Sequence, residues 1–348
     1  MKAFIISAGF IIGFILGFWP GVTRPKPFIW RLSAFVILAA MITLALLPHT
    51  AGSFKDAAIV GRMDSTQTIP VMLHTADVKI TDYQNGLKLL TTVSGNGLTV
   101  STIIGIDEAA TISGAEAAIL NVKREGADNF YRCESIAAID PTITLPYIIG
   151  LGERARNLYF HVPMSWIAIL AYIYALVYGI KYLSSRNLDH DIHSSSAAAL
   201  GTVFCILATA TGSIWAKFNW GSFWNWDPRQ TSIFVLLLIY AAYFALRSSI
   251  ENEHQRAKLS SAYSIIGGVS AIFFVYIAPR LYEGLHPGAA GDKSIGPVLS
   301  PQAHSLNHLK QIILSLSFAG FTILFFWLLG LTVRIRRLAL SSPASTEE

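Results

Sequence analysis

Charged residues are scarce in this sequence. Asp, Glu, Lys and Arg make up 14% of its 348 residues, whereas hydrophobic residues make up 53%. Soluble domains carry about 25% charged residues, so this composition excludes an ordinary soluble globular protein. The long apolar runs that replace the charges predict a membrane protein.

Cysteine is scarcer still. The two cysteines are Cys133 and Cys205, and neither belongs to a C-x-x-C or C-x-x-C-H pattern. We therefore expect neither a thiol oxidoreductase nor a c-type cytochrome. The sequence also lacks the G-x-x-x-x-G-K-[ST] pattern of a nucleotide-binding P-loop.

Seven apolar runs predict membrane-spanning helices. The hydrocarbon core is about 30 Å thick and a helix rises ~1.5 Å per residue, so most of these runs are long enough to cross it. The shortest run, Thr231 to Leu246, reaches a sufficient length only if its helix begins at Asp227-Pro228. The predicted spans are Ala3–Trp19, Trp30–Leu47, Leu158–Leu183, Ser196–Trp215, Thr231–Leu246, Ser261–Ala278 and Leu309–Val333.

Basic residues cluster in alternate connections between these runs. The four basic segments are Arg24–Arg31, Lys181–Arg186, Arg247–Lys258 and Arg334–Arg337. The positive-inside rule places them in the cytoplasm and the other connections outside. The net charge of +5 therefore reflects topology, and we expect no nucleic-acid binding. No small-residue cleavage site follows Trp19, so the first run is expected to be an uncleaved extra helix rather than a signal peptide.

One outer connection differs in character from the rest. Between residues 49 and 150, short β-prone runs with alternating apolar positions are separated by Asn85-Gly86 and Asn96-Gly97, which are strong hairpin signals. The predicted fold is thus an all-α polytopic membrane protein of about seven spans, six of them forming its core, with a small β-rich extracytoplasmic insert. The predicted parts are an extra helix (1–22), a first core helix (28–48), the insert (49–150), a membrane domain (151–335) with a tryptophan-rich outer loop (215–230), and a cytoplasmic tail (336–348).

The tryptophan-rich loop is the most unusual part of the sequence. Within "WAKFNWGSFWNWDPRQTS", twelve residues hold Trp215, Trp220, Trp224 and Trp226, half of the chain's 8 tryptophans. A single tryptophan at a membrane boundary is ordinarily an aromatic-belt residue, but this density exceeds what a belt needs. Asp227 followed by proline is also an ordinary helix N-cap.

Four of the nine histidines lie near the predicted outer ends of spans: His161, His286, His304 and His308. For each of them a polar anchor at the interface is the ordinary alternative. The i, i+4 pair His304 and His308 also has a spacing that suits a metal such as zinc. Two imidazoles from different helices can hold haem iron from both faces, and indoles suit a flat apolar porphyrin. Haem propionates need cationic partners, and the arginines at the same level are Arg154, Arg156, Arg229 and Arg280.

"WGSFWNWDPRQTS" resembles the signature of the tryptophan-rich haem-handling family of c-type cytochrome biogenesis. That family includes haem exporter protein C and the larger membrane subunit of a cytochrome c synthetase. "YFHVPMSWIAILAY" and "YEGLHPG" are similar to its two outer histidine segments, and the resemblance covers residues 30–333 without the insert. It implies that His161 and His286 are axial ligands of a transient, non-covalent haem b. The implied platform is Trp215, Trp220, Trp224, Trp226 and Asp227.

The resemblance also implies a role and partners. It implies a component of the bacterial inner membrane that presents haem on the periplasmic face to a haem chaperone, beside ATP-binding-cassette transporter subunits and lipid. We expect haem delivery rather than catalysis, and no catalytic residue. Because no histidine falls in the middle of a span, the shorter exporter type is favoured over a synthetase subunit or a redox b-type cytochrome. A haem-free scaffold anchored by its tryptophans remains an alternative.

Overall fold

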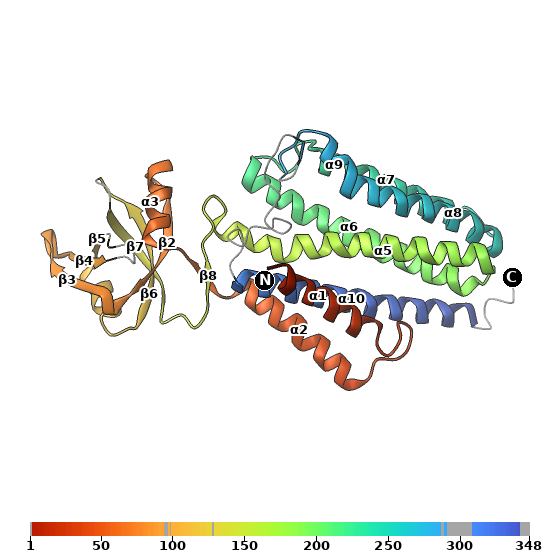
Figure 1. The fold of residues 1–348 in the computed structure, drawn as a ribbon, viewed down its shortest axis with the longest axis horizontal. Helices are drawn as coiled ribbons and strands as arrows, with labels where there is room; N and C mark the ends of the chain where they lie inside the picture. The colour runs from red at the N-terminus through yellow and green to blue at the C-terminus, as the bar shows by residue number, and fades with distance from the viewer. Residues whose placement is uncertain are drawn as a thin grey trace. The chain divides into compact units, whose positions relative to one another are not determined.

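The computed structural model describes residues 2–93, 97, 99–126, 129–286, 289–290 and 308–341. The chain divides into two compact units, one formed by residues 1–42 and 156–348 and the other by residues 43–155. The first, here called the membrane unit, is helical, and the second, the barrel unit, is rich in β-strands (Figure 1).

The helices of the membrane unit confirm a polytopic membrane protein. Within the part of the chain that the structure describes, six helical segments are long and apolar enough to cross a membrane. A seventh apolar helix, α1, has 17 residues and is shorter than these. The helices are α1 (Lys2–Phe18), α2 (Phe28–Leu46), α5 (Leu158–Ser185), α6 (Leu188–Trp220), α7 (Pro228–Ser248), α8 (Glu253–Ile272), the π-helical turn η4 (Phe273–Ile277), α9 (Ala278–Leu281) and α10 (His308–Ser341).

Capping residues set the ends of α6 and α7. Helix α6 continues to Trp220 because Gly221 adopts the left-handed conformation, with φ of 83°, that commonly ends a helix. The predicted boundaries of the outer loop, 215 and 230, were therefore both wrong. Within that range only residues 221–227 are non-helical. Helix α7 begins at Pro228 with Asp227 as its N-cap, which gives it the length that the sequence required for a span.

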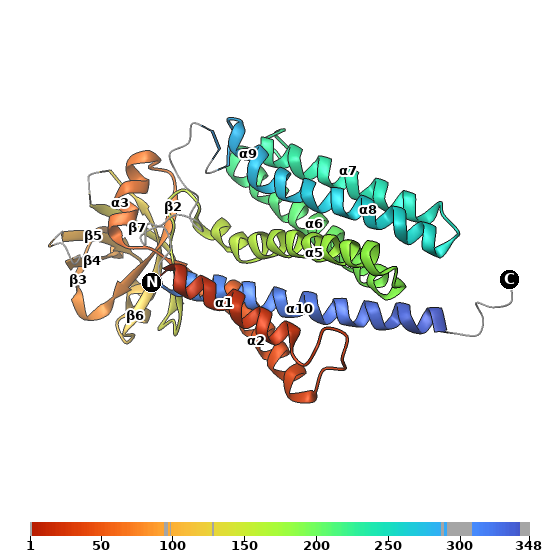
Figure 2. The ribbon, with the colours of Figure 1, turned by 45° about the vertical axis from the view of Figure 1, so that its right-hand side comes forward.

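Helix α1 packs against α10 along a face of small residues (Figure 2). Gly9, Gly13 and Gly17 recur every four residues and so share one face of the helix. A Cβ atom on Gly9 would overlap the carbonyl oxygen of Ser315, and a Cβ on Gly17 would overlap the ring of Phe326. Glycines at these positions let the two helices approach closely, as is common in membranes.

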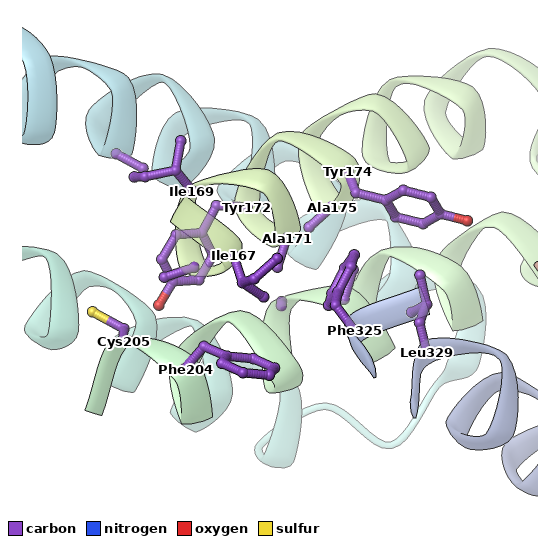
Figure 3. Close-up of a cluster of buried hydrophobic side chains, with 14 of the residues drawn as sticks. Ile167, Ile169, Ala171, Tyr172, Tyr174, Ala175, Phe204, Cys205, Phe325 and Leu329 are labelled. Atoms are coloured by element: carbon purple, nitrogen blue, oxygen red, sulfur yellow. The ribbon is translucent and has the colours of Figure 1, made fainter. Parts of the chain in front are cut away.

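The core of the membrane unit is built from large side chains of α5, α6, α7 and α10 (Figure 3). Tyr172 of α5 stacks on Tyr240 of α7 with ring centroids 3.7 Å apart and planes at 14°. Both rings are fully buried. Buried aromatic rings of this size dominate packing energy, so this stack fixes α5 relative to α7.

Charge pairs join helices at the end of α6 that lies far from the tryptophans. Arg247 of α7 donates to both carboxylate oxygens of Asp191 at 2.7 and 2.9 Å, and both side chains are buried or nearly so. Arg337 of α10 donates to both oxygens of Asp189 at 2.6 and 2.7 Å, in a more exposed position. These pairs link the start of α6 to the end of α7 and to α10.

The barrel unit confirms a small β-rich domain within the long connection. Its hairpin β3–β4 turns at Asn85-Gly86, both with positive φ, as the sequence predicts. Strands β4 and β5 are also antiparallel neighbours, although Asn96 of the second predicted turn lies outside the described residues. The elements are β1 (His49–Ala51), α3 (Phe54–Met63), β2 (Thr68–His74), η1 (Thr75–Asp77), β3 (Val78–Asp82), η2 (Gln84–Gly86), β4 (Lys88–Val93), β5 (Thr99–Ile104), α4 (Ile106–Ile112), β6 (Ala117–Arg124), β7 (Phe130–Ile139), β8 (Thr144–Pro146) and η3 (Gly152–Asn157).

The main sheet has the topology of an OB-fold. Its strand order is β2-β6-β7-β5-β4-β3, so its two outermost strands are β2 and β3, which follow each other across a single 3-10 turn. They act as two halves of one long first strand. Because this strand lies at both ends of the strand order, it closes the sheet. Among the described strands of this sheet, β5 and β7 form the one parallel pair, and α4 connects β5 to β6. Five strands in this arrangement form the Greek-key barrel called the OB-fold.

Candidate functional site

A cavity of about 160 Å³ lies among α5, α6, α7 and the α8–α9 segment of the membrane unit. Its walls are mostly apolar, and His161 and His286 both line it. Four of the apolar lining residues, Ala168, Ile169, Cys205 and Leu236, also belong to the helical core, so the cavity has a packed wall. The lining residues are His161, Ser165, Ala168, Ile169, Cys205, Ala208, Thr209, Gly212, Ser213, Trp224, Arg229, Gln230, Ile233, Leu236, Phe274, Val275, Pro279 and His286.

His161 is held by α6. It lies in the first turn of α5, and its Nδ1 is 3.0 Å from the carbonyl oxygen of Ala208 and 3.2 Å from the hydroxyl of Thr211. A carbonyl oxygen can only accept, so Nδ1 of the ring carries the proton and Nε2 carries the lone pair. Gly212 makes room for the ring, because a Cβ there would lie 2.8 Å from its Cε1 atom.

His286 reaches the cavity from a short loop after α9. The helix before it is interrupted by the π-helical turn η4, from which Phe274 and Val275 line the cavity. Such turns are rare and frequently occur at functional sites. Nδ1 of His286 lies 2.7 Å from Oδ1 of Asp227, and the edge of its ring meets Trp220 with centroids 4.7 Å apart. Since Nδ1 donates to the carboxylate, Nε2 is the ring nitrogen left to bind a metal.

Asp227 connects the tryptophan segment to this histidine. Oδ1 also accepts the backbone N–H of Arg229, which caps α7, and Oδ2 accepts the backbone N–H of Leu285 at 2.6 Å. Its side chain is 1% exposed. Burial by itself raises the pKa of the Asp227 carboxyl, but the hydrogen bond and charge of His286, with two backbone N–H donors, outweigh burial and lower that pKa to about 2. Asp227 is therefore ionised at neutral pH.

The four tryptophans differ in their surroundings. Trp224 lines the cavity and meets Trp226 edge to face, with centroids 5.8 Å apart. Trp226 is 67% exposed and has φ of 54°, which is unusual for a large side chain. Trp220 contacts the ring of His286. Trp215 is half-buried in α6 and is not among the residues that line the cavity.

The four arginines are also separated. Arg229 lines the cavity, and Arg280 lies close enough for its charge to act on Arg229. Arg280 itself donates to the carbonyl oxygen of Tyr276 one turn earlier. Arg156 is absent from the cavity lining, and Arg154 belongs to the barrel unit. Of the other two candidate histidines, His308 is an exposed residue at the start of α10, and His304 lies outside the described residues.

Several residues of the site carry no sequence signal. The partner of His161 is a backbone carbonyl, which any residue at position 208 would supply. Gly212 and Gly284 each let a neighbour approach closely, since a Cβ on Gly284 would lie 2.7 Å from Oδ2 of Asp227. Glycine before a functional histidine is the one signal in "YEGLHPG" that could have indicated this approach.

The cavity has the donors that a metalloporphyrin needs. Imidazoles whose Nδ1 atoms are engaged in hydrogen bonds can bind iron through Nε2, and the remaining walls are mostly apolar with an indole and a guanidinium. Within the described residues, no group of three or more His, Cys, Asp or Glu side chains forms a metal cluster.

The fold and the site together define a multi-pass helical membrane protein with a paired-histidine cavity. The sequence model of the family "Heme exporter protein C" matches residues 138–346, and the chain belongs to this family. Heme exporter protein C of Rhodobacter capsulatus is 34% identical over 189 residues, covering 54% of this chain and 75% of that protein. The Paracoccus denitrificans protein of the same name is 32% identical over 198 residues, covering 56% and 79%. The Escherichia coli K12 protein is 29% identical over 149 residues, covering 42% and 60%.

The family match begins at residue 138. It includes both histidines, the tryptophan segment and α5 to α10, whereas α1, α2 and most of the barrel unit precede it. The assignment of α2 to the family core therefore stays a prediction.

Proposed function

We propose that this protein holds haem between His161 and His286 and passes it to an acceptor, as a membrane component of cytochrome c maturation. One observation carries the proposal: two histidines from segments far apart in the sequence line one cavity, each with Nδ1 engaged in a hydrogen bond. A histidine ligand is ordinarily oriented in this way, with its second nitrogen donating to a carbonyl or carboxylate. The names of the relatives, which describe them as heme exporters, agree with it.

The haem is cargo, so the site must bind it without forming a covalent bond to the porphyrin. Two imidazoles on one iron supply enough affinity, and both can be exchanged. Cys205 lines the cavity but lies outside any C-x-x-C-H pattern, so the proposed cargo is haem b held non-covalently. Trp224 offers an indole face inside the cavity, with Trp226 beside it as the exposed part of the platform.

Charged groups at the rim orient the cargo. Arg229 lines the cavity, and Arg280 lies near it, so a propionate placed there would relieve the repulsion between two guanidiniums. We assign no propionate contact to Arg156, which lies outside the lining, or to Arg154.

The positive-inside pattern supports an outward-facing site. The tryptophan segment follows α6, whose other end adjoins the basic connection Lys181–Arg186. Haem would then be presented on the periplasmic face of a bacterial inner membrane to a haem chaperone, with ATP-binding-cassette transporter subunits as further partners.

The test is the absorption spectrum of the purified full chain in mild detergent, with and without added haem, for the wild type, His161→Ala and His286→Ala. We expect a low-spin bis-imidazole spectrum in the wild type and its loss or change in both variants. His254→Ala, at an exposed histidine in the first turn of α8, is the matched control and should leave the spectrum unchanged. A wild type that stays colourless with added haem would favour the haem-free scaffold. Haem bound equally by all variants would move the ligands elsewhere.

A further inference from the structure

We infer that Asp227 makes the two iron ligands unequal, so that His286 is the stronger donor and His161 the weaker one. This inference rests on the proposed function, because it concerns the iron held by those histidines. It gives Asp227 a positioning role and removes it from the haem platform itself.

The hydrogen bonds of Asp227 leave it no role as a haem contact. Both carboxylate oxygens are occupied by His286 and by two backbone N–H groups, and the side chain is almost fully buried. A propionate is also a carboxylate, so the negative charge of Asp227 would repel it. The carboxylate instead serves the ring of His286.

The partners of the two Nδ1 atoms differ in charge. His286 donates to a carboxylate at 2.7 Å, whereas His161 faces a neutral carbonyl at 3.0 Å and a hydroxyl at 3.2 Å. A carboxylate draws the Nδ1 proton toward itself and increases the electron density on Nε2, which raises the basicity of the ligand. A carbonyl does this more weakly, because it carries only a partial charge.

The loop that carries His286 is fitted to this contact. The N–H of Leu285 donates to Oδ2 of Asp227, so backbone and side chain of neighbouring residues bind the same carboxylate. This approach requires Gly284, because a Cβ there would lie 2.7 Å from Oδ2 and 3.1 Å from Cδ of Pro228. The carboxylate thus holds the position of His286 as well as its donor strength.

The consequence is a preference between oxidation states. A more electron-rich imidazole stabilises ferric iron more than ferrous iron, because the ferric centre carries the larger charge. Asp227→Asn keeps an acceptor oxygen for Nδ1 but removes the charge. Loss of such a partner typically weakens metal binding 10–100-fold. If ferric haem binding weakens tenfold and ferrous binding is unchanged, the reduction potential rises by about 59 mV.

The experiment measures ferric-haem affinity and reduction potential of the full chain in detergent for the wild type, Asp227→Asn, Gly284→Ala and Thr211→Val. We expect the first two variants to bind ferric haem about 10–100-fold more weakly, with the potential of Asp227→Asn raised. Gly284→Ala keeps the Asp227 carboxylate, whose Oδ1 caps α7, and crowds the loop against Oδ2, so it tests the contact even if Asp227→Asn folds poorly. Thr211→Val removes the hydroxyl beside His161 but leaves the carbonyl oxygen of Ala208, so we expect a smaller loss of affinity than in Asp227→Asn.

The outcomes separate this inference from the proposed function. Wild-type affinity and potential in both Asp227→Asn and Gly284→Ala, with binding still lost in His286→Ala, would overturn the unequal ligands and leave the haem site intact. An equal loss in Thr211→Val would also overturn it, because the two histidines would then depend alike on their partners. A wild type that binds no haem would instead remove the proposed function.

Discussion

Trp224 and Trp226 meet edge to face, with ring centroids 5.8 Å apart and planes at 89°. One ring lines the cavity and the other is mostly exposed, and the backbone at the exposed one has a positive φ. A left-handed conformation costs a residue with a Cβ roughly 1–2 kcal/mol. We attribute the strained position next to Asp227 to the proposed haem platform, of which Trp226 is the exposed part.

Trp226→Gly should therefore separate stability from binding. Glycine adopts positive φ freely, so the variant should unfold at the same temperature as the wild type or a higher one, while its haem affinity falls. Trp226→Ala removes the same ring but keeps the strain, and should show the same loss of haem with no gain in stability. Thermal unfolding in detergent and haem titration of both variants make the comparison. Unchanged haem affinity in both would remove Trp226 from the platform.

Acid should lower the stability of the haem-free protein by protonating Asp227. The folded-state pKa of its carboxyl is about 2, below its ordinary value of 3.8, so the ionised form is favoured by folding. Its contribution, of the order of 2 kcal/mol, is present above about pH 4 and is lost as the pH falls through 2. Thermal unfolding of the haem-free protein between pH 5 and pH 2 should show this decline in the wild type. The same series in Asp227→Asn should lack that part of the decline, and identical curves would contradict the assignment.

The two charge pairs at the start of α6 should differ in their contribution to stability. Asp191→Asn leaves Arg247 buried without its carboxylate and should cost about 3–5 kcal/mol. Asp189→Asn breaks the more exposed pair with Arg337 and should cost about 1 kcal/mol or less. Unfolding free energies of both variants in detergent test this order, and equal losses would contradict it.

Substitutions of the glycines on the packed face of α1 should destabilise the protein to an extent that depends on the atoms the new Cβ would overlap. Gly9→Ala would overlap backbone atoms of α10, whereas Gly17→Ala would overlap the side chain of Phe326. Overpacking of this kind costs about 1–3 kcal/mol, with Gly9→Ala at the upper end. Ile11→Ala, at an exposed position of α1, is the control. If Gly9→Ala is as stable as this control, α1 does not pack on α10 through this face.

Much of this architecture could be predicted because it depends on local chemistry. Apolar runs located the helices, and Asp227-Pro228 located the start of α7 through its capping hydrogen bond. Asn85-Gly86 located a hairpin because both residues accept positive φ. The end of α6 was missed because the segment from Trp215 to Trp220 shows no helical signal other than Gly221 after it.

The missed features depend on contacts distant in sequence. Closure of the barrel follows from pairing of β2 with β6 and of β3 with β4, which no local pattern encodes. Of the four candidate arginines, Arg229 lines the cavity, and no local pattern distinguishes it from the other three. The orientation of His161 depends on the carbonyl of Ala208, a group common to every residue.

Imidazole rescue tests the central claim most directly. His161→Gly and His286→Gly each remove one proposed iron ligand and leave a space that free imidazole can fill. We predict that each variant, loaded with ferric haem in detergent, loses the low-spin bis-imidazole spectrum and regains it when imidazole is added. The account would be contradicted if either variant kept the wild-type low-spin spectrum without added imidazole, because the iron would then be held by other ligands.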